Sequence, residues 1–342
     1  MIDLTQLSPL LQGRIQRFKQ HQFGYVSLWI FIFVLIISLF ANLIANDRPL
    51  LLSYKDHLYT PIFKQYPETM FGGTFETETD YRDPVVKELI NKKGWMIWPL
   101  IPFSDQTPNL ELNVSVPSAP SSQNWLGTDD QGRDVSARIL YGLRVSILFG
   151  IALTFAGTLL AIVVGAVQGY FGGLIDLIGQ RLVEVWGGMP QLFLTMILVS
   201  IFSPSVYWLF AIMLLFGWMS LVGLVRAEFL RARHLDYVRA AQGMGVSPFK
   251  IIYKHILPNV FSSSLSQIPF ILTANITALS TLDFLGYGLP LGSPSLGELF
   301  TQARNNLDSP WLALSAFFTF LILLTILVFI GEAARDAFDP KR

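Results

Sequence analysis

The sequence predicts an all-α membrane protein with six transmembrane helices and an insert between the first and second of them. This prediction depends on a mean hydropathy of +0.49, a charged fraction of 14%, and six apolar runs without a charged residue. Charged residues usually make up about a quarter of a globular chain. We therefore expect a bilayer, rather than water, to surround most of these helices.

The six uncharged runs are Tyr25–Ala45, Val145–Val167, Pro190–Phe202, Val206–Val225, Val260–Leu282 and Trp311–Ile330. The first has 21 residues, enough to cross the roughly 30 Å hydrocarbon core as a helix. A secretory signal is the alternative for this run, but its apolar part would be shorter and a small-residue cleavage site would follow. The short run Pro190–Phe202 gains length from the amphipathic segment Leu174–Trp186.

Positive charges orient the predicted helices. With the N-terminus in the cytoplasm, the inside segments hold thirteen Lys and Arg residues, whereas the short outside segments hold one, Arg304. Cytoplasmic loops carry such an excess in membrane proteins. The predicted organisation is a cytoplasmic segment 1–24, a transmembrane helix 25–45, an outside insert 46–134, and a core 135–342 that holds five transmembrane helices and the cytoplasmic loop 226–259. Both termini are then cytoplasmic.

The insert differs in composition from the helices. Residues 47–134 contain 13 acids, 8 bases and eleven aromatic residues. This aromatic content is too high for a disordered tail, so we expect a small domain or a structured loop. Its end, the Pro- and Ser-rich segment Val116–Gln123, is typical of a linker.

A turn and a helix start follow at 124–146. Asp129 favours an Asx turn, Gly132 allows positive φ, and Asp134 caps a helix that begins at Val135. A calcium loop is the alternative for these acids, but the alternating acids and the terminal Glu of such a loop are missing.

The segment Leu235–Asn259 is a polar hairpin between two apolar runs and predicts two short amphipathic helices. Asp236 is expected to cap the first helix, and Gly243 and Gly245 to end it. Ser247 caps the second helix, with Pro248 at its first position, and Pro258 ends it. The expected apolar faces are Tyr237, Ala240, Ala241 and Met244 in the first helix, and Phe249, Ile252, Tyr253 and Ile256 in the second.

Several chemistries are missing from the sequence. It has no cysteine, no P-loop, no H-E-x-x-H and no G-x-S-x-G, and its four histidines are scattered. We therefore expect no enzyme activity, no metal site and no cofactor, and a net charge of zero gives no sign of nucleic acid as a partner. Proton-coupled carriers usually keep ionisable residues within the bilayer, and the apolar runs have no Asp, Glu, Lys, Arg or His. Sodium coupling through hydroxyl and carbonyl oxygens stays open.

Three motifs carry a resemblance to the permease subunits of dipeptide/oligopeptide-type ABC importers. The "EAA" loop of that family is matched by Arg239-Ala240-Ala241, Gly245 and Ile256-Leu257-Pro258, although Arg239 stands where the family has Glu. The words G-T-D-x-x-G-R-D at 127–134, followed by Arg138, and F-L-G-x-G at 284–288, followed by P-S-x-G, match two further motifs in the same order. The insert, with FGGTF and TDYRDP, is similar to that of the microcin C-type oligopeptide permease.

The resemblance implies the type I ABC importer permease fold in the bacterial inner membrane. It also implies a homologous second permease, a cytoplasmic ABC ATPase that binds the ATP, a periplasmic binding protein, and a peptide substrate. The alternative is a self-contained channel or an ion-coupled carrier with an extracytoplasmic gating domain.

The resemblance also assigns candidate site residues. Those expected to couple to the ATPase are Asp236, Tyr237, Arg239, Ala240, Ala241, Gly245, Ser247, Pro248, Ile256, Leu257 and Pro258. Those expected at the periplasmic gate or the binding-protein contact are Asp129, Arg133, Asp134, Arg138, Phe284, Gly286 and Gly288. A bare connecting loop and a DNA-reading helix-turn-helix are the other interpretations of the hairpin. Membrane helices at both ends disfavour the second, and a short rigid helix would transmit an ATPase movement that a flexible loop would absorb.

Overall fold

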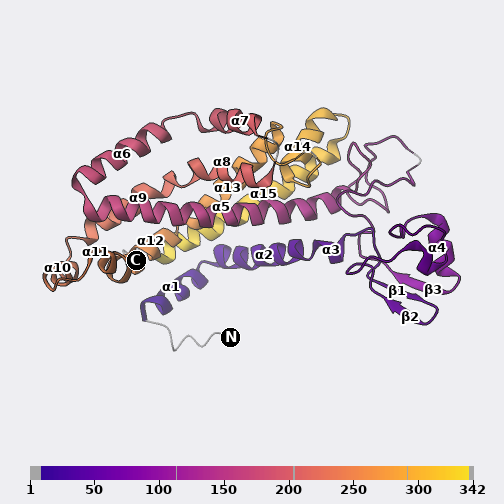
Figure 1. Ribbon diagram of the computed structural model, residues 1–342, viewed down its shortest axis with the longest axis horizontal. Coiled ribbons are helices and arrows are strands. Elements are labelled where there is room, and N and C mark those ends of the chain that lie inside the picture. Colours follow the sequence, from indigo (N-terminus) through magenta and orange to yellow (C-terminus); the bar gives the residue numbers. More distant parts are fainter. Residues whose placement is uncertain (1–8, 113, 203–204, 291, 339–342) are drawn as a thin grey trace. The chain divides into compact units, whose positions relative to one another are not determined.

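The computed structural model describes residues 9–112, 114–202, 205–290 and 292–338 (Figure 1). Parts of three predicted regions lie outside the described residues: residues 1–8 of segment 1–24, residue 113 of the insert 46–134, and residues 203–204, 291 and 339–342 of the core 135–342. The chain divides into two compact units, which are described separately. Unit 1 comprises residues 1–32, 147–290 and 321–342, and unit 2 comprises residues 33–146 and 291–320.

Helices dominate unit 1. Those that lie wholly within it are α1 (Pro9–Gln20), α6 (Gly173–Gly187), α7 (Gln191–Ile201), α8 (Val206–Gly217), α9 (Met219–Ala232), α10 (Asp236–Gly243), α11 (Pro248–Lys250), the π-helix η3 (Ile251–Ile256), α12 (Leu257–Leu265) and α13 (Ile268–Phe284). The long helices α2 (Gln22–Leu39), α5 (Val135–Phe171) and α15 (Pro310–Phe338) contribute residues to both units.

Unit 2 contains a small antiparallel sheet with strand order β2-β1-β3, whose strands are labelled in Figure 1. Its elements are α3 (Ala41–Ile44), β1 (Leu51–Tyr54), β2 (His57–Tyr59), the 3-10 helix η2 (Glu68–Phe71), α4 (Pro84–Asn91), β3 (Gly94–Ile97) and α14 (Leu296–Asn305). Phe71 and Ile90 are fully buried in the core that this sheet shares with η2 and α4. The insert therefore folds around a core of its own.

The all-α prediction is wrong for this sheet. Strands of three or four residues are too short to show a two-residue period. The turn between β1 and β2 is also unusual, because Lys55 and Asp56 both have positive φ, of 50° and 61°. Such two-residue hairpins normally use Asn-Gly or Asp-Gly, so the sequence lacked the usual signal.

Length and composition allow three helices of the described chain to cross a membrane: α2, α5 and α15. Two bent pairs raise the number to as many as five, α6 with α7 at 76° and α8 with α9 at 41°. Helix α13 is apolar but shorter. The count of six transmembrane helices stays a prediction.

Small residues let α5 approach the α8–α9 segment closely within unit 1. A Cβ atom built on Gly165 would lie 2.8 Å from Val225 Cβ, and one on Gly169 would lie 2.5 Å from Phe229 Cβ. A Cβ atom built on Gly157 would lie 3.7 Å from the carbonyl carbon of Gly217. The stripe of small residues on α5 is therefore a packing surface, as small residues at membrane-helix interfaces generally are.

This packing gives opposite expectations for two glycine substitutions. Alanine normally stabilises a helix by about 0.5–1 kcal/mol relative to glycine, and Gly223→Ala in α9 should show that gain because no atom lies within 4 Å of its Cβ position. Gly169→Ala should instead lower the unfolding temperature, since overpacking costs about 1–3 kcal/mol. Thermal unfolding of the detergent-solubilised protein, followed by size-exclusion chromatography, measures both. Equal shifts for the two variants would contradict the close approach.

Candidate functional site

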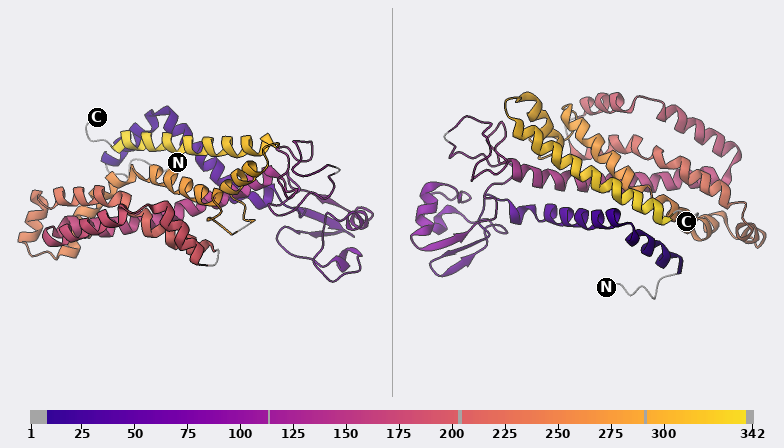
Figure 2. Two further views of the ribbon diagram at one scale, coloured as in Figure 1. Left: turned by 90° about the horizontal axis from the view of Figure 1, so that it is seen from above. Right: turned by 180° about the vertical axis from the view of Figure 1, so that it is seen from behind.

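The hairpin predicted at 235–259 lies beyond the end of α9 and is built from α10, α11 and the π-helix η3 (Figures 1 and 2). One side of it is anchored in the core of unit 1. Val238, Ala241, Ile251 and Ile256 are at most 2% exposed and join a cluster that includes Phe229. The hairpin is therefore fixed to the helices by its own apolar residues.

The other side of the hairpin leaves large apolar side chains exposed. Met244 is 75% exposed, Phe249 78% and Tyr253 66%. The rings of Phe249 and Tyr253 stack, with centroids 6.4 Å apart and planes only 7° apart. An exposed apolar group of this kind is typical of an interaction surface.

The predicted apolar face of the first helix is wrong. Ala241 is buried as expected, but Tyr237, Ala240 and Met244 are exposed and Val238 is buried in their place. In the second helix Ile256 is buried, whereas Phe249 and Tyr253 are exposed. A helical period identifies stripes of residues but does not determine which stripe faces the bundle.

The ends of the hairpin helices also differ from the prediction. Asp236 is the first residue of α10 and does not cap it; the cap position is Leu235. Gly245 has the expected positive φ, of 76°, with open space around its Cβ position. Gly243 is the last residue of α10. Ser247 and Pro248 occupy the predicted cap and first positions of α11, but the Ser247 side chain makes no capping hydrogen bond.

Pro258 does not end the second helix, contrary to the prediction. The chain passes from α11 through the π-helix Ile251–Ile256 into α12, and Pro258 lies in the first turn of α12. Proline lacks the N–H that an α-helix interior would use, and a first-turn position tolerates that loss. The wider π turn thus joins the hairpin to the next apolar helix without a break.

Most of the residues expected to contact an ATPase are accessible. Ala241 and Ile256 are buried, Leu257 is half-buried, and the exposed ones are Asp236, Tyr237, Arg239, Ala240, Gly245, Ser247, Pro248 and Pro258. Within the described residues, Arg239 takes part in no ion pair. Its charge is therefore available to a partner.

The second predicted group forms a buried ion network in unit 2. Arg133 Nε donates to Asp129 Oδ2 at 2.7 Å, and Arg138 Nε lies 3.4 Å from the same oxygen. Glu298 on α14 accepts from Arg138 and lies 3.5 Å from Arg133 Nη2. Gln302, one turn further along α14, donates to Glu298 over 3.2 Å. Two guanidinium groups thus balance two carboxylates.

Asp134 starts α5 next to this network. Its Oδ1 accepts from Ala137 N at 2.8 Å, which confirms the predicted cap, and its Oδ2 accepts from Asn124 Nδ2 at 2.7 Å. Burial raises the pKa of the Asp134 carboxyl, and these hydrogen bonds partly oppose the shift. The predicted Asx turn is also present, because Asp129 Oδ1 accepts from Gln131 N and Arg133 N, at 2.9 Å each.

Burial changes the role expected for these residues. Asp129, Arg133, Asp134 and Arg138 are at most 2% exposed, so they do not form a surface on which a binding protein could dock. They instead hold the start of α5 to α14 within unit 2. A role in gating stays a prediction.

The remaining residues predicted for the gate belong to unit 1. Phe284 is the last residue of α13, and Gly286 follows with φ of +81°. Gly288 is buried, and a Cβ there would lie 1.7 Å from Asp283 Oδ1. That oxygen accepts from Leu289 N at 2.7 Å. The two glycines therefore follow the end of α13 and close a tight turn.

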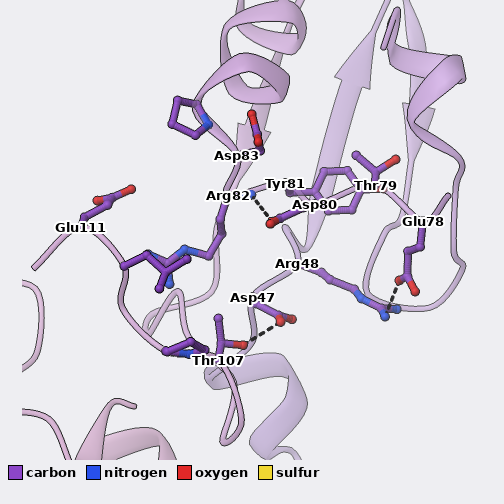
Figure 3. Close-up of a pocket in the computed structure, with 13 residues that line it drawn as sticks. Asp47, Arg48, Glu78, Thr79, Asp80, Tyr81, Arg82, Asp83, Thr107 and Glu111 are labelled. Carbon is purple, nitrogen blue, oxygen red and sulfur yellow. Dashed lines mark hydrogen bonds and ion pairs between the residues drawn. The ribbon is translucent and has the colours of Figure 1, made fainter. Parts of the chain in front are cut away.

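A cleft of about 590 Å³ opens in the insert (Figure 3). Its lining includes five acids, Asp47, Glu78, Asp80, Asp83 and Glu111, and two arginines, Arg48 and Arg82. Both arginines are engaged: Arg48 pairs with Glu78, and the Arg82 guanidinium lies 4.0 Å from the centroid of the Phe103 ring. The cleft is therefore negative overall.

Sequence reasoning missed Glu298 and the ion pair between Asp176 and Arg226. Glu298 follows the P-S-x-G word directly, and an acid in the first turn of a short helix was its only signal. Its partners are 160 and 165 residues away in sequence, so no local pattern could reveal them.

Comparison with known proteins places this architecture in a family. The model of the binding-protein-dependent transport system inner membrane component matches residues 139–342. The chain belongs to this family. A second model, the N-terminal TM domain of oligopeptide transport permease C, matches residues 9–65. The family consists of transport components of the inner membrane, not of enzymes.

Relatives match along nearly the whole chain. The inner membrane ABC transporter permease protein YejE of Escherichia coli is 53% identical over 99% of both chains. The peptidoglycan transport system permease protein YejE of Agrobacterium fabrum is 48% identical over 98% of this chain and 94% of its own length. The dipeptide transport system permease protein DppC of Bacillus subtilis is 34% identical over 65% of this chain and 70% of its own.

A solved structure of the MetNI methionine ABC transporter in inward facing conformations has the same fold. The match has a TM-score of 0.50 at 15% identity and covers 59% of this chain and 96% of the other. The helical part of the chain therefore has the fold of a type I importer permease.

The buried network predicts an unequal response to two similar substitutions. Glu298→Gln removes one carboxylate and leaves the buried charge of Arg138 without a full partner. Breaking a buried pair lowers the free energy of unfolding by about 3 kcal/mol at the lower end of its range. We expect a loss of up to this size because the Glu298 side chain is 21% exposed. Glu184→Gln removes the carboxylate of an exposed pair with Arg181 and should change stability by less than about 1 kcal/mol. Thermal unfolding in detergent distinguishes them, and equal unfolding temperatures would contradict the structural role of the network.

Proposed function

We propose that the chain is a permease subunit that carries peptides, either oligopeptides or microcin C-like peptides, across the inner membrane in a binding-protein-dependent ABC importer. The observation that carries this proposal is the 53% identity with an ABC transporter permease along 99% of both chains. Further relatives are named as transport permeases for dipeptides, oligopeptides and peptidoglycan. These names agree on solutes that contain peptide bonds.

The energy for transport comes from ATP bound by partner subunits. The chain itself has no P-loop, and its six apolar runs have no Asp, Glu, Lys, Arg or His. Intramembrane ionisable residues commonly mark proton pathways, and without them a proton-coupled carrier is disfavoured. A cytoplasmic ABC ATPase therefore supplies the power, and this chain needs no cofactor.

The hairpin 235–259 is the surface that receives the ATPase. Its buried side is fixed to the helices, and its opposite side exposes Met244, Phe249 and Tyr253. An aromatic pair with an apolar neighbour is suited to fill a groove on a partner, as aromatic anchors do in protein interfaces. Arg239, exposed on α10 in place of the usual Glu, offers its charge to an acceptor on the ATPase.

The distribution of positive charge supports a membrane orientation with both termini and the hairpin in the cytoplasm and the insert 46–134 in the periplasm. Six helices cross the membrane in this arrangement. A homologous second permease completes the translocation pathway, and a periplasmic binding protein delivers the peptide.

The proposed function is tested by uptake into proteoliposomes that contain the chain with its partner permease, ATPase and binding protein. The substrate is a mixture of labelled short oligoalanines. Uptake should require ATP on the side of the membrane that the ATPase faces and the binding protein on the other side. Uptake by the chain alone and without ATP would favour a channel or ion-coupled carrier and would overturn the proposal.

The exposed aromatic pair yields a second expectation. Phe249→Ala combined with Tyr253→Ala should reduce the amount of ATPase that co-purifies with the permease, because the partner loses its apolar anchors, while the amount of folded permease stays constant. Phe63→Ala in the insert is the matched control, since Phe63 is 79% exposed, close to the 78% of Phe249. Undiminished co-purification in the double variant would rule out this docking face.

A further inference from the structure

Helix α6 joins the rest of unit 1 through a link of two glycines. It follows α5 across Gly172 and Gly173, which both have positive φ, of 64° and 56°. A Cβ on Gly172 would lie 2.1 Å from Arg233 Nη1, whereas the position at Gly173 is open. Two successive glycines in this conformation leave the backbone few steric limits.

Helix α6 also lacks buried anchors. None of its residues, all of which the structure describes, is buried. Gln180 donates to Gln168 on α5, and Trp186 near the far end donates to the carbonyl of Leu215 over 3.1 Å. Apolar packing therefore does little to fix the first turns of α6.

A bidentate ion pair holds these first turns to α9. Arg226 Nη2 donates to Asp176 Oδ2 at 2.7 Å, and Arg226 Nε donates to the second oxygen, Oδ1. The side chains of Arg226 and Asp176 are only 27% and 15% exposed. Two parallel bonds between a planar guanidinium and a carboxylate fix orientation as well as distance.

Helix α9 is the element that leads into the hairpin. It is continuous from Met219 to Ala232, and α10 begins at Asp236. Its buried face, with Val225 and Phe229, packs against the small residues of α5. Arg226 lies between these two packing residues in sequence, so its backbone has a defined position on the helix that carries the hairpin.

We propose that the Asp176–Arg226 pair is a positioning contact that makes α6 follow α9 when the hairpin moves. The inference rests on the proposed function, because the ATPase supplies that movement. The two glycines allow α6 to change its direction relative to α5, and the ion pair makes it move with α9. Movement received at the hairpin is thus passed through α9 and Arg226 to the bent α6–α7 segment. Loss of the pair leaves the core intact and releases the first turns of α6 from α9, while Gln180, Val183 and Trp186 still hold the later turns.

The experiment uses spin labels, because the sequence has no cysteine to remove. In the complete importer, one label pair joins Leu182 on α6 to Leu159 on α5, and a second joins Gln242 on the hairpin to Leu159. All three positions are exposed. Pulsed electron paramagnetic resonance compares the distances in the nucleotide-free state with those after trapping with ATP and vanadate.

Both distances should shift on trapping in the parent protein. In Asp176→Asn and in Arg226→Gln, the Gln242 distance should still shift and the shift at Leu182 should be lost. The exchange Asp176→Arg with Arg226→Asp should restore it. Glu184→Gln, which breaks an exposed pair on the same helix, is the matched control and should retain both shifts.

Each other result has a definite meaning. A Leu182 shift that persists in both single variants overturns the inference, and so does an exchange variant that leaves it lost although the importer assembles. If the Gln242 distance does not respond to ATP and vanadate in the parent protein, the proposed function itself fails. A loss of both shifts in the single variants shows a general structural role for the pair and likewise overturns the positioning role.

Discussion

The close approach of α5 to α9 is the contact on which the rest of unit 1 depends. Gly165 and Gly169 leave room for Val225 and Phe229, so the two helices pack at a distance that any larger side chain would prevent. In a lipid environment such packing replaces the hydrophobic effect as the source of helix association. Because α9 leads directly to α10, this contact also sets the position from which the hairpin projects and the place at which Arg226 meets Asp176.

Unit 2 uses a different kind of interaction. Arg133 and Arg138 are almost fully buried beside two carboxylates, and Arg138 also donates to the carbonyl oxygens of Asp105 and Ser293. Withdrawing charges from water is costly, and buried pairs of this kind are better suited to fixing one arrangement than to adding stability. The network therefore gives α14 a specific place against the start of α5, whereas the packing of α5 on α9 requires only shape.

Local patterns in the sequence predicted part of the local structure. The cap at Asp134, the Asx turn at Asp129 and the left-handed Gly245 follow from short-range backbone chemistry, and the structure confirms them. The cap expected at Asp236 and the helix end expected at Pro258 were wrong. The family assignment from three motifs was also correct. Features that depend on distant partners were not predictable: which face of α10 is buried, the carboxylate that faces Arg138, and a sheet whose strands are shorter than any reliable period.

The π-helical turn at Ile251–Ile256 sets how the residues before it are rotated about the helix axis relative to α12. A π turn holds one more residue than the α-helical ladder would, so removing one residue there would restore a regular helix and rotate everything before it by about 100°. Ile251 would then leave the core, and the stacked rings of Phe249 and Tyr253 would face a different direction. The number of residues in this one turn therefore sets the direction in which Phe249 and Tyr253 face. Inserting or deleting a residue there changes that direction more than most side-chain substitutions would.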